Sequence, residues 1–225
     1  MKIQLLLNKK GVTLIELLVG LVISGLVVAG IYRVFIAQTR AYAIQDQVVE
    51  VQQNIRIAME LLLRDLRMAG FDDDNVNSPI TIANPIVYPV AANSVAVIYE
   101  QYNTTTLQYE THTVSYSRDA VNSRLDRQLT INNVAGPLEH ILDNVNALNL
   151  TYGVDTNDDG TADTNPADGT IWWTAGAVGT AKVVAIRVQL TARPDPTNPD
   201  VQSMVSPRTL DSTVTLRNLS LIRLN

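Results

Sequence analysis

The densest group of potential metal ligands in this 225-residue chain lies between Asp155 and Asp163. Oxygen-bearing side chains fall on alternate residues, and Gly160 stands where a calcium-binding loop makes its sharp turn. The candidate ligands are Asp155, Asn157, Asp159, Thr161 and Asp163. The bidentate acid that closes such a loop is missing because Pro166 occupies the twelfth position, although Asp163 or Asp168 could substitute. The segment predicts a Ca²⁺ site, and an acidic turn that binds no ion is the alternative.

A second unusual group is the carboxylate of Glu16, which lies near the start of a long apolar run. From Leu17 to Tyr32 no residue is charged. Together with residues 12–15 the run reaches the roughly 20 residues that span a bilayer. A carboxylate inside such a helix costs about 2.5–3.5 kcal/mol, which predicts a partner for Glu16. The alternative is a protonated or snorkelling acid without a partner.

Two lysines and a glycine, Lys9, Lys10 and Gly11, precede the apolar run. A secretory signal ends its apolar stretch at a small-residue cleavage site, whereas here the small residue comes before that stretch. Cleavage between Gly11 and Val12 would remove a basic leader, residues 1–11, and leave the apolar segment as the mature N-terminus. The positive-inside rule keeps the leader cytoplasmic and places the C-terminal domain outside the cytoplasm. A simple signal anchor is the alternative.

The sequence Gly11-Val12-Thr13-Leu14-Ile15-Glu16 resembles the class III signal of type IV pilins and pseudopilins. Most members of that family have phenylalanine where this chain has Val12. The resemblance implies cleavage by prepilin peptidase after Gly11 and N-methylation of the new terminal amine. It also implies that Glu16 meets the terminal amine of a neighbouring subunit during assembly.

Helical periodicity continues beyond the apolar run. Apolar residues recur at gaps of 3 or 4 from Ile44 to Ala69, which predicts an amphipathic helix. Gly70 is the expected C-cap, so one helix of about 87 Å is expected from Val12 to Ala69. Its first half, residues 12–37, is apolar all round and suits lipid or a filament core. Its second half, residues 38–70, buries one stripe against a sheet, and a coiled coil is the alternative for this stripe.

Residues 71–225 are expected to form a β-rich globular head. Segments rich in Val, Thr and Tyr, or alternating between apolar and polar residues, predict strands. The predicted strands are residues 94–99, 105–117, 184–190 and 213–217. Residues 194–200 predict the loop of a long hairpin between the last two. The pattern of residues 138–150 is ambiguous, and its apolar spacing fits a short helical turn that leads into a strand ending near Tyr152.

Composition narrows the functional classes. The formal charge of the chain is −5, and it becomes −8 once the 3 leader lysines are removed. Because an acidic domain binds phosphate backbones poorly, nucleic acid is not an expected partner. Cysteine is absent, so the exported domain has no disulfide and no cysteine nucleophile. A G-x-S-x-G elbow and a GxxxxGK[ST] loop are also absent. His112 and His140 lie far apart without ligand spacing. The chain is therefore expected not to be an enzyme.

Three further segments are similar to the PilW type of minor pilin. They are the helix end from Gln52 to Phe71, the stretch from Val145 to Asp155, and the closing segment from Thr213 to Asn218. The sequence Arg64-Asp65-Leu66-Arg67 also resembles the J-type minor pseudopilin of type II secretion, the nearest alternative. Major pilins fit less well, because they commonly have a proline in the N-terminal helix and a C-terminal disulfide.

The resemblance implies an α+β type IV pilin fold, with a long N-terminal helix packed on an antiparallel β-sheet head. It implies a minor pilin that helps to prime assembly of a type IV pilus, at or near the tip. A minor pseudopilin and a pilus-tip adhesin are the alternatives. The implied partners are other minor and major pilins, prepilin peptidase, the inner-membrane assembly platform and the membrane itself. The implied location is the inner membrane, with the head in the periplasm, and then the extracellular pilus. Ca²⁺ is the one cofactor that the sequence suggests.

Overall fold

The computed structural model describes residues 11–72, 80, 82, 84–87, 93–194 and 206–220. The chain divides into two compact units, Met1–Asp46 and Gln47–Asn225, and the boundary between them falls inside helix α1. Leader residues 1–10 and residues 195–200 of the predicted hairpin loop lie outside the described residues.

Helix α1 extends from Leu14 to Arg67 as one α-helix, close to the predicted 12–69. In the first unit its apolar side chains are exposed on every side; Leu14 is 81% exposed and Leu26 70%. An 18-residue window there has a mean hydropathy of 2.5 and no buried residue, and α1 is the one described helix long and apolar enough to cross a membrane. Ser24 and Thr39 donate their hydroxyl hydrogens to carbonyls one turn back, so these polar groups are satisfied within the helix.

The predicted C-cap of α1 is confirmed. Gly70 has a φ of 68°, the left-handed conformation that glycine adopts without strain. A Cβ atom added to Gly70 would lie 2.6 Å from Cδ2 of Leu219. Asn218 donates from Nδ2 to the carbonyl oxygens of Arg67 and Ala69, at 3.4 and 3.3 Å. The short helix α4 (Arg217–Ser220) therefore covers the last turn of α1.

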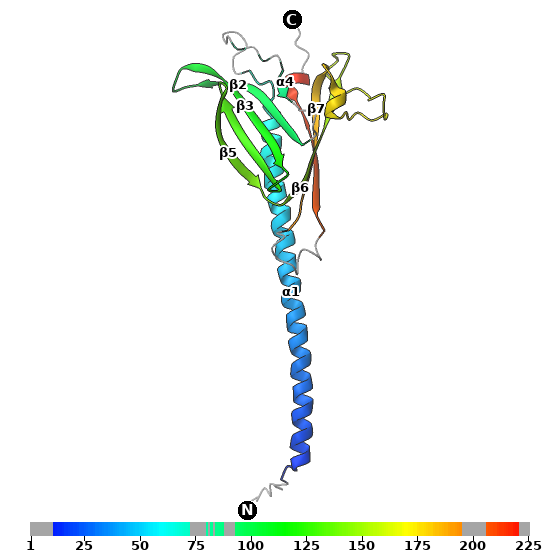
Figure 1. Cartoon of the computed structure of the whole chain (residues 1–225). Helices are drawn as coiled ribbons and strands as arrows, with labels where there is room; N and C mark the ends of the chain where they lie inside the picture. Colours follow the sequence, from blue (N-terminus) through cyan, green and yellow to red (C-terminus); the bar gives the residue numbers. More distant parts are fainter. Residues whose placement is uncertain are drawn as a thin grey trace, which may run out of the picture. The chain divides into compact units, whose positions relative to one another are not determined.

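The second unit contains two antiparallel sheets (Figure 1). One has the strand order β1-β2-β3-β4-β5 and the other β6-β7-β8. Their bounds are β1 Ile86–Val87, β2 Ser94–Asn103, β3 Gln108–Asp119, β4 Arg124–Ile131, β5 Val134–Leu142, β6 Val145–Asp155, β7 Lys182–Ala192 and β8 Arg208–Thr215. A four-residue helix, α2 (Ala175–Val178), precedes β7. The predicted α+β class with antiparallel sheets is confirmed.

Three features of the second unit differ from the sequence-based description. Residues 138–150 contain no helical turn: β5 ends at Leu142, and Asn144, with a φ of 58°, turns the chain into β6. Strands β4 and β5 were not predicted, because bulges break the alternation of their apolar and polar residues. Gly136 of β5 lies close to β4: a Cβ atom added there would be 2.8 Å from the carbonyl oxygen of Leu129. Strand β8 begins at Arg208, earlier than predicted, and is followed by α4.

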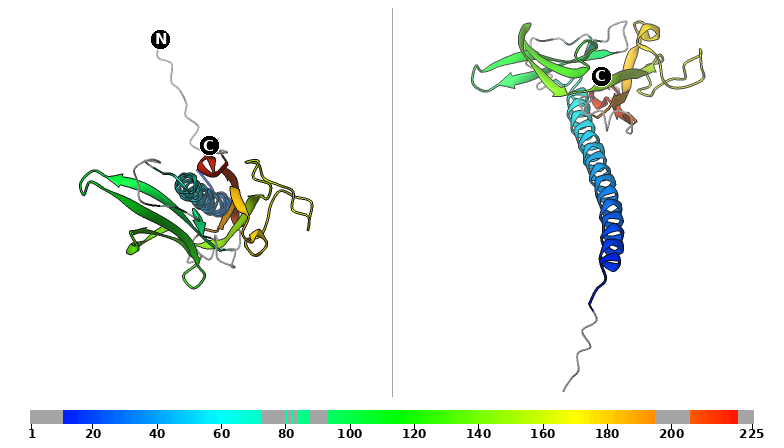
Figure 2. Two further views of the ribbon diagram at one scale, coloured as in Figure 1. Left: turned by 90° about the horizontal axis from the view of Figure 1, so that it is seen from above. Right: turned by 60° about the horizontal axis from the view of Figure 1, so that its bottom comes forward.

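The part of α1 in the second unit lies between the two sheets, as the view from above shows (Figure 2). Its buried residues form one hydrophobic core with residues of both sheets, among them Val114 of β3 and Ile186 of β7. Within the predicted stripe Ile55, Ala58, Leu62, Leu66 and Ala69 are buried. Full burial of a leucine or isoleucine side chain contributes about 1.5–3 kcal/mol, so this stripe fixes the helix in the head. The prediction of a sheet-packed helix, rather than a coiled coil, is confirmed.

Candidate functional site

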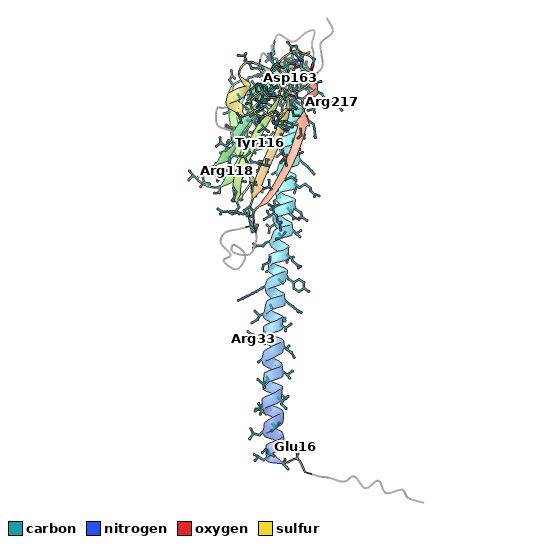
Figure 3. All side chains as sticks on the ribbon, turned by 90° about the vertical axis from the view of Figure 1, so that its right-hand side faces the viewer. Glu16, Arg33, Tyr116, Arg118, Asp163 and Arg217 are labelled. Carbon is teal, nitrogen blue, oxygen red and sulfur yellow. The ribbon has the colours of Figure 1, made fainter. Side chains whose placement is uncertain are left out.

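The first turn of α1 carries Glu16 (Figure 3). The backbone N–H of Glu16 donates to Oγ1 of Thr13 at 3.3 Å, and Oε2 of Glu16 accepts from the backbone N–H of Thr13 at 3.4 Å. This reciprocal pair is a capping box, and it places a negative charge at the positive end of the helix dipole. The Thr-Leu-Ile-Glu motif therefore has a local role in starting the helix.

The predicted processing site precedes this capping box. Gly11 and Val12 lie outside the helix, and Val12 is 73% exposed, so the peptide bond between them is open to a protease. The hydrogen bonds of the Glu16 carboxylate go to Thr13 of the same turn. Pairing of Glu16 with the terminal amine of a neighbouring subunit stays a prediction.

In the acidic loop after β6, side-chain oxygens accept hydrogen bonds from backbone N–H groups of the same loop. The two carboxylate oxygens of Asp155, a residue 2% exposed, accept from the N–H groups of Asn157 and Gly160 at 3.2 and 2.8 Å. Asp159 accepts from both the hydroxyl and the backbone N–H of Thr161, and these hydrogen bonds lower the pKa of Asp159. Among the described residues no three His, Asp or Glu side chains are grouped as metal ligands.

The remaining predicted ligand, Asp163, also bonds within the loop. Its Oδ2 accepts from the backbone N–H of Thr156 at 2.7 Å. The carbonyl of Asp163 accepts from the indole N–H of Trp173 at 3.3 Å, and Trp173 packs against the core beside Tyr152 of β6. The structure thus brings the five predicted ligands into one hydrogen-bonded turn, and the Ca²⁺ site stays a prediction.

A buried cluster around Asp65 joins α1 to the five-stranded sheet. Oδ2 of Asp65, a residue 6% exposed, accepts from the hydroxyl of Tyr116 and from Nε of Arg127, both at 2.8 Å. Its Oδ1 accepts from Arg64 at 3.1 Å. Arg127 also donates to Glu139 of β5 at 2.7 Å. Burial, and then the hydrogen bond to Asp65, raise the pKa of Tyr116, which therefore remains a neutral donor at physiological pH.

Sequence reasoning did not identify Asp65 as a key residue. The signal was available: Asp65 follows Leu62 by three residues and so falls on the apolar side of the helix, where an acid needs a partner. The two histidines lie on different strands and meet different acids. His140 of β5 contacts Asp126 at 2.7 Å, and His112 of β3 lies 3.6 Å from Glu110.

A groove of about 440 Å³ lies in the second unit. One wall is a face of α1, and the other is made by the β5–β6 turn and the end of β7. The lining residues include Glu50, Asn54 and Ile57 of α1, His140 and Asp143 of the turn region, and Arg193 after β7. Ile57 is 64% exposed, so an apolar side chain of the helix lies uncovered at this groove.

Two family models match this chain and agree with these features. Residues 6–32 match the model of the prokaryotic N-terminal methylation motif, which contains Gly11, Val12 and Glu16. Residues 111–223, half of the chain, match the model of type IV pilus-assembly protein W, from β3 to α4. A solved type IV-like pilin from Thermus thermophilus is 14% identical, with a TM-score of 0.48; the match covers 75% of this chain and 97% of that chain. No curated protein matches. The chain belongs to the family of type IV pilus-assembly protein W.

Proposed function

We propose that this chain is a minor pilin that takes part in priming the assembly of a type IV pilus and is located at or near the pilus tip. The PilW family is one of structural pilus subunits, and the matched family is that of pili rather than of type II secretion. The single observation that carries the proposal is the contrast in burial along α1. A head with a complete core is joined to a segment that buries nothing, and such a segment requires lipid or other subunits as its surroundings.

The proposal assigns each part of the chain to one stage. Residues 1–11 form the leader that prepilin peptidase removes, and residues 12–37 first hold the subunit in the inner membrane. On assembly the same segment leaves the lipid and packs with the helices of other minor and major pilins. The terminal amine exposed by cleavage meets Glu16 of a neighbour, which neutralises a charge in an apolar setting. Residues 38–70 fix the head, residues 71–225, to this helix.

Glu16 and the apolar segment around it have different surroundings in the membrane and in the assembled pilus. In the membrane Glu16 lies at the helix start, where the capping box satisfies its carboxylate. In a bundle of parallel helices, the terminal amine of one subunit lies close to the Glu16 carboxylate of its neighbour. The two groups are separated by only about one helical turn along the axis, so this carboxylate is the nearest anion for the amine. In this scheme the head lies in the periplasm before assembly and outside the cell after assembly.

Removal of this chain from the cell distinguishes the proposed role from its alternatives. We expect the number of surface pili to fall at least about tenfold while the membrane pool of major pilin is unchanged, because a priming subunit acts before elongation. Export of secreted proteins should continue. Normal piliation with loss of protein export would identify a pseudopilin instead. Normal piliation with loss of surface attachment would identify an adhesin.

A further inference from the structure

The segment between β6 and β7 places a tryptophan on the outer face of the three-stranded sheet. Tyr152 of β6 and Trp173 exchange backbone hydrogen bonds at 2.9 and 2.8 Å, and both side chains lie against the core. Because successive residues of an extended chain point to opposite sides, Trp172 points away from the core. In agreement, the guanidinium carbon of Arg187 in β7 lies 6.0 Å from the centroid of the Trp172 ring. The view from above shows this segment, in yellow, on the side of β7 away from α1 (Figure 2).

The sheet face beside this tryptophan is polar. Two cross-strand rows of the face consist of polar side chains: Asn149, Gln189 and Asp211 in one, and Thr151, Arg187 and Thr213 in the other. Adjacent strands lie about 4.8 Å apart, so each row spans about 10 Å from β6 to β8. The face is therefore an open polar surface with one indole beside it.

Hydrogen bonds join these side chains into one network. Nδ2 of Asn149 donates to Oε1 of Gln189 at 3.4 Å, and Nε of Arg187 donates to both carboxylate oxygens of Asp211 at 3.0 Å. Nε2 of Gln189 lies 3.5 Å from the same carboxylate. Each amide has two donor hydrogens and two acceptor lone pairs, so the network orients both amides and leaves further donors and acceptors for a ligand.

The charges of this face cancel. Arg187 and Asp211 are the charged side chains of the two rows, and they pair with each other. An anionic ligand needs a cation, and this guanidinium is already held by a carboxylate beside an indole. The main contact residues of a protein partner lie in desolvated pockets, whereas the groove described above is lined by other residues. The composition of the face therefore favours a neutral ligand rich in hydroxyl groups.

We propose that this face binds a neutral oligosaccharide, with one sugar ring stacked on Trp172. The C–H hydrogens of a sugar ring carry a small positive charge, and the face of an indole is its negative side. Sugar hydroxyls both donate and accept, so they pair with the amides of Asn149 and Gln189 and with the carboxylate of Asp211.

The source of this ligand is a polysaccharide outside the cell. Glycan strands of the bacterial cell wall carry carboxylates, and the cation of this face is already paired with Asp211. Binding is additional to the proposed priming role and does not depend on it, because it uses the head alone.

Titration of the full-length protein with defined oligosaccharides tests the proposal. The protein is kept in a detergent without a sugar head group, and the probes are cellohexaose, maltohexaose and the hexamer of N-acetylglucosamine. We expect calorimetry to show that at least one probe binds with a Kd of about 1 mM or below. Salt raised from about 0.05 to 0.5 M should leave this Kd unchanged, because the ligand is neutral. Failure of all three probes to bind, or tighter binding of a soluble cell-wall muropeptide, would overturn the proposal.

Substitutions on the face supply the second arm. Trp172→Ala should weaken binding at least about tenfold, whereas Trp172→Tyr, which keeps an aromatic ring, should stay within about threefold of the native affinity. Gln189→Ala should weaken binding about threefold through loss of its amide. The matched control is Ile171→Ala, which removes an exposed apolar side chain of the same segment and should leave the Kd unchanged. Native affinity in Trp172→Ala, or an equal loss in Ile171→Ala, would contradict the site.

Piliation separates this site from a contact between subunits. Cells that carry Trp172→Ala should assemble pili in native number, because the sugar site takes no part in priming. Fewer pili, together with loss of co-purification with other pilins, would identify the face as a subunit contact and overturn the sugar site. The priming role itself is tested by removal of the whole chain, so the two proposals fail separately.

Discussion

Residues 14–46 and 47–67 belong to one helix, yet their side chains meet different surroundings. The later segment buries Ile55, Leu62 and Leu66 in the core of its own head. The earlier segment is more apolar and buries nothing in its most hydrophobic window. The two segments of this helix therefore have different roles. Residues 47–67 complete the core of the head, and residues 14–46 require lipid or other subunits to cover their apolar side chains.

The two acids of this helix that lie in apolar surroundings show the same contrast. Asp65 has three donor side chains within its own chain, from α1, β3 and β4. Among the residues that the structure describes, the hydrogen-bond partner of the Glu16 carboxylate is the threonine of its own first turn. An acid with a complete set of internal partners stabilises the subunit. An acid without one is available for assembly, and mutations at the two sites should separate these roles.

The largest expected effect is that of Asp65→Ala. Removal of this carboxylate leaves Arg127 and Tyr116 buried without their acceptor, and loss of one partner from a buried charged cluster costs about 3–5 kcal/mol. Urea unfolding of the full-length protein in detergent measures the change in the free energy of unfolding. The matched control is Glu60→Ala, an exposed acid on the same helix, which should change that free energy by less than about 0.5 kcal/mol. Equal effects at the two positions would mean that the cluster is not a stabilising device.

A smaller loss of stability is expected from Gly70→Ala. Alanine pays roughly 1–2 kcal/mol in the left-handed conformation, and its Cβ also forces Leu219 to move. Gly176→Ala in α2 is the control, because nothing lies within 4 Å of the added Cβ. Thermal unfolding should show a lower Tm for the first variant and an unchanged or slightly higher one for the second. An unchanged Tm for Gly70→Ala would contradict the C-cap described for α1.

Glu16 should affect assembly without affecting the head. Glu16→Ala removes the cost of a carboxylate in the apolar segment, so membrane insertion should be normal or improved. Incorporation into the minor-pilin complex, measured by co-purification with other pilins, should fall several-fold. Glu16→Gln sharpens the comparison, since glutamine can still form a capping box but carries no charge. Assembly by the Gln variant at wild-type levels would show that the local cap, and not pairing with an amine, is what matters.

The smallest effect concerns the acidic loop, where internal hydrogen bonds already satisfy the turn. If Ca²⁺ binds there, millimolar calcium should raise the Tm by a few degrees relative to chelator, about the effect of 1 kcal/mol. Asp155→Ala with Asp159→Ala should abolish the difference, and magnesium should not reproduce it. Identical melting curves in calcium and chelator would identify the loop as an acidic turn alone.

Local signals in the sequence were sufficient for the helix and for part of the head. Helical periodicity and Gly70 predicted α1 to within two residues at each end, because both signals are local to the helix. Strands β2, β3 and β7 alternate regularly and were predicted, whereas β4 and β5 carry bulges that break the alternation. Pairing across a sheet depends on distant residues, and the sequence does not reveal it directly.

The residues of the candidate site also divide into those that local sequence signals predicted and those that depend on the fold. Gly11, Val12 and Glu16 form one short motif, so they could be found in the sequence, as could the acidic loop after β6. The groove could not be predicted, because its walls come from α1, the β5–β6 turn and the end of β7. Two of the three partners of Asp65, Tyr116 and Arg127, lie 51 and 62 residues away along the chain, so only the fold brings them to the acid.

The position of the mature N-terminus tests the central claim most directly. Mass spectrometry and N-terminal sequencing of the protein purified from membranes should find a chain that begins at Val12 with a methylated amine. Gly11→Glu should leave the uncleaved precursor in the membrane, with a head of unchanged stability. A mature chain that begins at any other residue, or a fully processed Gly11→Glu variant, would contradict the assignment of the apolar helix as a pilin assembly segment.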